Sequence, residues 1–110
     1  MAWLLRDGEV LASLEIAEGL AARTKGLLGR DSLEGAMLVK ARSVHTIGMR
    51  FSIDVAFCDR DLVVLDTKTL APGRLSLPRR RGCRVLEARA GAFDHWRLRP
   101  GDRLEIKGGP

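Results

Sequence analysis

Apolar and polar residues alternate over several short stretches of the chain, and this period of two predicts β-strands. The alternation is clearest in residues 10–16, where one face carries Val10, Ala12, Leu14 and Ile16. A second apolar run, residues 3–5, precedes it, and Asp7-Gly8 stands in the connection. Because glycine accepts the positive φ of a tight type I′ turn, the pattern predicts an N-terminal β-hairpin.

A second hairpin is predicted in the middle of the chain. Residues 53–58 alternate again, residues 59–61 (Asp-Arg-Asp) form a turn, and residues 62–69 return as a strand. Further short strands are expected at residues 36–39, 85–88 and 104–106. The segment 43–50 contains Gly48, which indicates a bend or a bulge.

The period changes in residues 17–28, where Leu20, Leu27 and Leu28 have helical spacing and Gly29 can end the helix. One helical turn is expected around Phe93 and Trp96. Residues 71–82 hold two prolines and three consecutive arginines, a composition typical of an irregular loop. The predicted fold is mainly β, a sandwich or small barrel of short, mostly antiparallel strands with one short helix packed against it. Residues 1–110 are expected to form a single domain.

Composition adds limits on location and on redox chemistry. The 110 residues are 45% apolar, enough for a core without disulfides, and no uninterrupted apolar run is long enough for a spanning helix. Arg6 and Asp7 interrupt the first apolar run, so we expect no leader peptide and a cytoplasmic protein. Cys58 and Cys83 form no C-x-x-C motif and are expected to be free thiols.

Four motifs occur in a characteristic order: Arg-Thr-Lys-Gly-Leu-Leu-Gly-Arg at 23–30, His-Thr-Ile-Gly-Met-Arg-Phe-Ser-Ile-Asp-Val-Ala-Phe at 45–57, Val-Leu-Glu-Ala-Arg-Ala-Gly at 85–91, and Pro-Gly-Asp at 100–102. Together they resemble the DUF192 family of unknown function, in a subgroup with His-Thr-x-Gly-Met in the central block. Leu28 stands where the family usually has methionine. The resemblance implies a compact β-rich fold and no particular activity.

Charged and polar residues inside the otherwise apolar motifs are the candidates for function. We expect a shallow cleft that binds a small anion, a peptide end or an acidic protein partner, formed by Arg30, His45, Met49, Arg50 and Asp54. An arginine fork suits carboxylate or phosphate groups. The structural alternative is that Arg30 or Arg50 pairs with Asp54 or Glu87 to fix loops on the sheet.

An enzymatic alternative remains open from the sequence, although we favour a binding protein. A hydrolytic or metal-assisted enzyme would use His45 and Asp54, and a nucleophile would be Cys58 or Cys83. His45, Met49 and Cys58 together would suit copper. They lack a recognised ligand spacing, so we predict no metal and no cofactor.

The net charge of +5 favours anionic partners, although arginine enrichment also follows from the codon composition of a genome. The densest basic patch is Arg74, Arg79, Arg80, Arg81 and Arg84. Such a loop could bind nucleic acid non-specifically by neutralising phosphates. Specific nucleic-acid binding is not expected, because only 5% of the residues are aromatic and no nucleic-acid-binding motif occurs. The sequence leaves the oligomeric state open.

Overall fold

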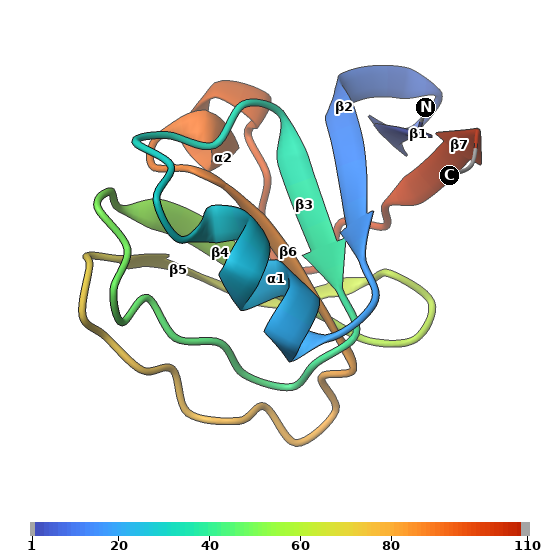
Figure 1. Cartoon of the computed structure of the whole chain (residues 1–110). Coiled ribbons are helices and arrows are strands. Elements are labelled where there is room, and N and C mark those ends of the chain that lie inside the picture. The colour runs from blue at the N-terminus through green and yellow to red at the C-terminus, as the bar shows by residue number, and fades with distance from the viewer. Residues whose placement is uncertain (1, 109–110) are drawn as a thin grey trace.

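The computed structural model describes residues 2–108, which form seven strands and two helices. The strands are β1 (Ala2–Arg6), β2 (Glu9–Ala17), β3 (Ala36–Val39), β4 (Ile53–Cys58), β5 (Val64–Leu70), β6 (Arg84–Arg89) and β7 (Glu105–Gly108). The helices are α1 (Leu20–Leu27) and α2 (Ala92–Trp96). All seven strands belong to one sheet, in the order β5-β4-β6-β3-β2-β1-β7. The fold is mainly β, as predicted, and Figure 1 shows the arrangement.

The N-terminal hairpin forms as its turn residues require. Asp7 and Gly8 both have positive φ, 52° and 78°, and β1 pairs antiparallel with β2. The pairing shifts between Leu4 and Leu5, which face Ala12 and Val10, so Leu11 is an extra residue on β2. This is a β-bulge, which bends the strand and redirects side chains.

The helix α1 connects two parallel strands, β2 and β3, which are the only parallel pair among the described strands. Arg23 and Leu27 are its buried side chains, and residues four apart lie on the same face of a helix. The helix therefore lies against the sheet through one arginine and one leucine.

The sheet curls, and its two edges approach each other at one end. Val63, beside β5, forms an isolated antiparallel bridge with Arg103, and the Leu104 N–H donates to the Leu62 carbonyl at 2.9 Å. The sequence left a sandwich and a barrel as alternatives. The structure is a single curled, partly closed sheet.

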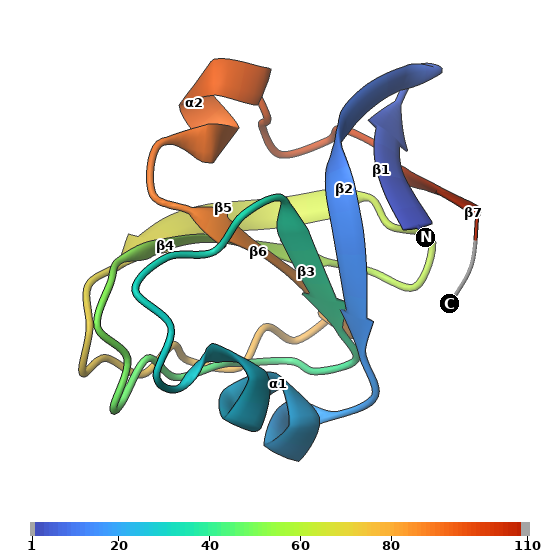
Figure 2. The ribbon, with the colours of Figure 1, turned by 45° about the horizontal axis from the view of Figure 1, so that its top comes forward.

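One hydrophobic core lies inside the curl and a second lies on its outer face. The inner core takes residues from nearly every strand and is completed by Ala92 and Phe93 of α2 and by Leu98. The outer core is covered by α1 and by the loops around Val44 and Met49. Figure 2 shows α1 on one side of the sheet and α2 on the other.

Because the central strands have a core on each face, they are buried on both sides. All six residues of β4 are buried, including Asp54. The predicted second hairpin is present as β4 and β5, and α2 is the expected helical turn.

Candidate functional site

Two loops on the side of α1, residues 43–49 and 71–76, pair with each other through hydrogen bonds. The Thr46 hydroxyl donates to the Ala71 carbonyl at 2.6 Å and accepts from the Arg74 N–H at 2.9 Å. The Ser76 hydroxyl bonds both backbone groups of Val44 at 2.9 and 3.0 Å. Because these hydrogen bonds are largely buried, they hold residues 43–49 and 71–76 in a defined geometry.

This pairing turns apolar side chains outward. Alternate side chains of extended segments point to opposite sides, and Val44, Thr46 and Ser76 point inward. The outward set is joined by Leu28, since a Cβ added at Gly48 would stand 2.9 Å from its side chain. We call this set the loop-face patch: Leu28, His45, Ile47, Leu75 and Leu77. Leu75 and Leu77 are 71% and 77% exposed, although most large apolar side chains are buried.

The same two loops carry the positive charge of the chain. Residues 40–52 and 71–84 contain eight of the nineteen lysines and arginines and none of the fourteen acidic residues. The rest of the chain has eleven basic and fourteen acidic residues and is net negative. A genome-wide preference for arginine would not concentrate the excess charge in two loops that meet, so codon composition does not account for this distribution.

Within the predicted basic patch, Arg79 has a structural role. Its guanidinium forms an ion pair with Asp66 at 2.9 Å and stacks on the ring of Phe57, 4.2 Å from the centroid. Arg84 is half-buried and donates to the neighbouring Cys83 carbonyl. Arg74, Arg80 and Arg81 are exposed. These three, and not the whole predicted set, are available to a partner.

A buried ion pair lies beneath the loop-face patch. Arg23 of α1 and Glu87 of β6 both have fully buried side chains and bond through several atoms, including Arg23 Nε to both Glu87 oxygens at 3.0 Å. Arg23 Nη1 also donates to the His45 carbonyl, and Nη2 lies 3.9 Å from the sulfur of Met49. Burial raises the pKa of Glu87, while the hydrogen bond and charge of Arg23 act in the opposite direction. The pair thus anchors the loop that carries His45.

The hydrogen bonds of His45 define which ring nitrogen carries the proton. The Ile47 N–H donates to Nδ1 at 3.2 Å, so Nδ1 is an acceptor and the proton of the neutral ring is on Nε2. Nε2 lies 3.4 Å from the Thr24 hydroxyl oxygen. This arrangement presents a hydrogen-bond donor, whereas a general base would need an unprotonated nitrogen facing its substrate.

The other predicted site residues do not join His45. Asp54 lies on the opposite face of β4, where it accepts hydrogen bonds from Thr69 and from the backbone of Gly91 and Phe93 at 2.7–3.1 Å. The single cleft expected from the sequence is therefore wrong with respect to Asp54, and so is a catalytic pair of His45 and Asp54. Successive side chains of a strand point to opposite faces, so Asp54 points away from the face that carries Ile53 and Val55.

Arg30 and Arg50 do form ion pairs, but not the predicted ones. Arg30 lies 3.4 Å from Glu15 and Arg50 lies 3.4 Å from Asp31, in both cases at exposed positions. Glu87 pairs with Arg23 instead. Exposed pairs of this kind contribute about 0–1 kcal/mol, so both guanidinium groups can exchange to a partner.

Cys58 does not lie with His45 and Met49. Cys58 belongs to the inner core and Met49 to the outer core, so the copper set of His45, Met49 and Cys58 is not assembled. Burial, with smaller effects from Asp59 and Cys83, raises the pKa of Cys58 to about 12. Such a thiol is protonated and unreactive at neutral pH. Within residues 2–108, no three His, Cys, Asp or Glu side chains gather at one point.

Comparison with known proteins places the whole fold in one family. A model of DUF192, described as "Uncharacterized ACR", matches residues 2–106. The chain belongs to the DUF192 family. It is 30% identical over 105 residues to a UPF0127 protein of Pyrococcus horikoshii, covering 90% of this chain and 88% of that one. A UPF0127 protein of Pyrococcus abyssi is 28% identical over 98 residues, covering 84% of each.

Two crystal structures share this DUF192 fold at low identity. A protein of unknown function from Novosphingobium aromaticivorans has a TM-score of 0.77 and 22% identity, covering 94% of this chain and 82% of that one. A protein from Sinorhizobium meliloti, described as a candidate transcription regulator, has a TM-score of 0.77 and 23% identity, covering 96% and 91%. Neither helix of the described residues is long and apolar enough to cross a membrane.

In this DUF192 chain, sequence reasoning missed two of the most buried polar residues. In the sequence, Arg23 stands out only as part of the motif at 23–30, and Glu87 only as a candidate partner of Arg30 or Arg50. A usable signal was present for Glu87, because it is a charge between the core residues Leu86 and Ala88 of one strand. For Arg23 the signal is weaker, since only Leu27, one turn later, is a core residue of the same helix. Leu75 and Leu77 of the loop-face patch were also missed, since they lie in a segment whose sequence predicts only an irregular loop.

Proposed function

We propose that this DUF192 protein is a binding module whose loop-face patch receives an acidic protein segment with apolar side chains. The observation that carries the proposal is the combination of exposed leucines and isoleucine with a loop surface that holds the entire positive charge excess. Interfaces combine apolar anchors with a charged rim in this way. The hydrogen bonds of Thr46 and Ser76 prepare the surface before a partner arrives.

The aliphatic patch favours protein over nucleic acid as the partner. Single-stranded nucleic acid is bound by aromatic stacking, and the exposed large side chains of these loops are aliphatic. A phosphate backbone offers nothing apolar for Leu75 and Leu77 to contact. The description of the S. meliloti protein does not alter this, because 23% identity supports the fold alone.

The roles of the patch and of the exposed arginines in the same loops follow from exposure. Leu75, Leu77 and Ile47 supply contact area, and Arg74, Arg80 and Arg81 attract the acidic partner and fix its orientation. Fully burying one leucine contributes about 1.5–3 kcal/mol, so two of them would change the dissociation constant by tenfold or more.

A direct test measures binding of defined probes by fluorescence anisotropy. The probes are a labelled peptide of alternating leucine and glutamate, the same peptide with serine for leucine, and a peptide with lysine for glutamate. We expect the first to bind best and its affinity to fall as salt is raised. Labelled duplex DNA and vesicles of anionic phospholipid serve as competing partner classes.

Two variants separate the contribution of the patch from that of the arginines in the same loops. The double variant L75S/L77S should weaken the leucine-glutamate peptide at least tenfold, and R80Q/R81Q should reduce its salt dependence. The matched controls are L20S and R103Q, exposed residues of the same types outside the loops. Equal binding by L75S/L77S and the wild type would refute the proposal, as would binding of duplex DNA or vesicles in preference to every peptide.

A further inference from the structure

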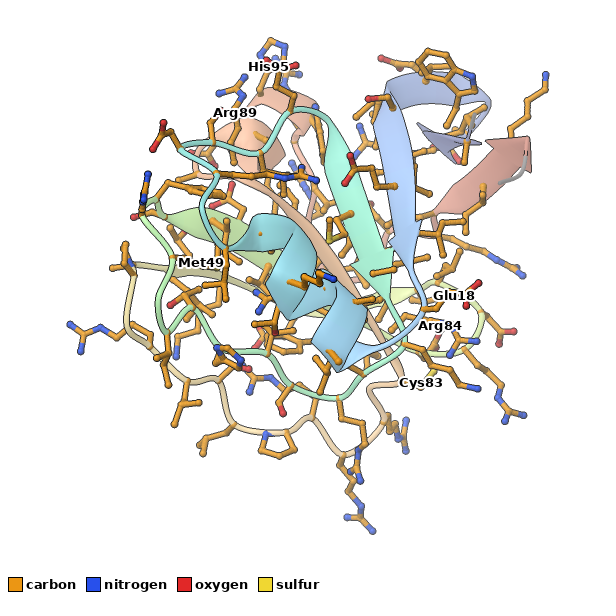
Figure 3. All side chains as sticks on the ribbon, in the orientation of Figure 1. Glu18, Met49, Cys83, Arg84, Arg89 and His95 are labelled. Carbon is orange, nitrogen blue, oxygen red and sulfur yellow. The ribbon has the colours of Figure 1, made fainter. Side chains whose placement is uncertain are left out.

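A groove on the opposite side of the sheet lies between the β1–β2 hairpin and α2, remote from the loop-face patch. Two open hollows of about 520 and 360 Å³ share a wall formed by Leu11, His95 and Trp96. These volumes are in the range of small-molecule sites. Figure 3 labels Arg89 and His95 at this end of the molecule, near α2.

The apolar wall of the groove is built by the bulge in β2. Because Leu11 is the extra residue, it and Ala12 both pack against the inner core, although neighbours in a regular strand face opposite sides. Trp96 is half-buried, with its ring 5.6 Å from that of Phe93. Leu11 and Trp96 thus supply apolar side chains to the lining of both hollows.

The polar wall is mainly cationic. Arg97 lines one hollow and Arg89 the other, both exposed, and within residues 2–108 neither forms an ion pair. Glu9 is the acidic side chain on this wall. Arg6 is not free for a ligand, since it donates to the carbonyls of Trp96 and Arg97 and forms an ion pair with Asp102 at 3.0 Å. Arg6 fastens the end of α2 to β1 and positions Arg97.

Arg97 has a left-handed backbone conformation that glycine adopts more easily than arginine. Its φ of 56° and ψ of 38° are left-handed, at the position after a helix where glycine is preferred. An arginine side chain is not required there for the turn. Strained residues that are held by surrounding contacts are concentrated at binding sites, and Arg6 supplies such contacts.

From this geometry we infer that the groove binds a small organic carboxylate, with its apolar body on Leu11 and Trp96 and its carboxylate at Arg97. A guanidinium fork matches a carboxylate in shape and charge, and a flat apolar body matches the indole face. The carboxylate can belong to a free small acid or to the C-terminus of a peptide. This inference is independent of the proposed function of the loop face.

The test uses the fluorescence of Trp96. The chain has two tryptophans, so W3F leaves Trp96 as the sole reporter, and Trp3 is an exposed residue of β1 outside the groove. The W3F protein is titrated with phenylacetate and, in parallel, with neutral phenylacetamide. A second pair of probes is a short peptide ending in phenylalanine with a free or an amidated C-terminus.

We expect a saturable change in Trp96 fluorescence with phenylacetate or with the free peptide, and at least tenfold weaker binding of the matching amide. A response to phenylacetate would show that a free small acid is sufficient for binding. A response to the free peptide alone would show that the groove binds a peptide C-terminus. Adding R97G to W3F should weaken binding at least tenfold without lowering Tm, because glycine suits the left-handed turn. R97K should keep part of the affinity, and R103Q should keep all of it.

Three results would overturn the inference. One is the absence of a saturable response to either carboxylate, and another is equal binding of acid and amide. The third is undiminished binding by R97G, whose intact fold is verified by its Tm. None of these results bears on the loop-face patch, because L75S/L77S and R97G alter opposite sides of the sheet.

Discussion

Replacing Arg23 with methionine should make the stability of the protein strongly pH-dependent. Glu87 would remain fully buried but would lose the hydrogen bonds and the charge that oppose the effect of burial on its pKa. The folded variant would therefore hold the Glu87 proton at pH values where the unfolded chain has released it. Stability then falls as pH rises above the ordinary glutamate pKa of 4.5.

The size of the effect follows from linkage and from buried ion pairs in general. One proton bound only by the folded state lowers the free energy of unfolding by up to about 1.4 kcal/mol per pH unit. Removing one partner of a buried pair costs about 3–5 kcal/mol at neutral pH. The wild type should show the same direction but a shallower slope, because Arg23 opposes the rise in the pKa of Glu87.

Urea denaturation between pH 4.5 and 8, followed by tryptophan fluorescence, measures this slope. The double variant R23M/E87Q has no ionisable group at either position, so its curve should lack the additional slope and it should be more stable than R23M at pH 7. R42M replaces an exposed arginine and controls for loss of positive charge. If the free energy of unfolding depends on pH in the same way for R23M and the wild type, the reasoning is refuted. Buried Glu87 would then be ionised in the folded protein even without Arg23.

Three further substitutions test how the structure holds its surfaces. Asp54→Ala removes the acceptor of three hydrogen bonds and should lower the free energy of unfolding by about 2–4 kcal/mol. Backbone amides at the start of α2 should exchange faster, and unchanged exchange there would contradict the role of Asp54 as an anchor of α2. Gly35→Ala places a methyl group 2.7 Å from the backbone carbonyl oxygen of Ser13 and should lower Tm more than Gly73→Ala, which also has positive φ but faces open space. Equal Tm values for the two variants would show that the strand moves aside without cost. Thr46→Val keeps the side-chain shape but loses the hydrogen bonds of the hydroxyl to residues 71 and 74. The backbone amides of residues 71–76 should therefore exchange hydrogen for deuterium faster, as measured by mass spectrometry. Unaltered exchange would mean that backbone pairing alone fixes the loop.

Local patterns were sufficient where neighbouring residues determine the structure. The turn at Asp7-Gly8 depends on two residues that accept positive φ, and the helix of residues 20–27 depends on spacing within one segment. Motifs spread over most of the chain were sufficient for the family. The positive charge of the two loops is also legible in the sequence, since it needs only the positions of charged residues.

The face on which each candidate side chain lies was decided by the tertiary structure. Asp54 and His45 are near in sequence, but β4 alternates its side chains between two cores, and this separates them across the sheet. Arg23 and Glu87 are 64 residues apart and meet only because α1 packs over β6.

The two candidate binding surfaces depend on pairings of the same long-range kind. Leu75 stands beside His45 because two irregular loops form a bridge, and the groove at Trp96 exists because a bulge turns Leu11 toward α2. The sequence by itself therefore determined the elements, the family and the sign of the charge. Contacts between distant segments decided which residues share a surface, because the burial and pairing that select them arise only when the sheet has closed.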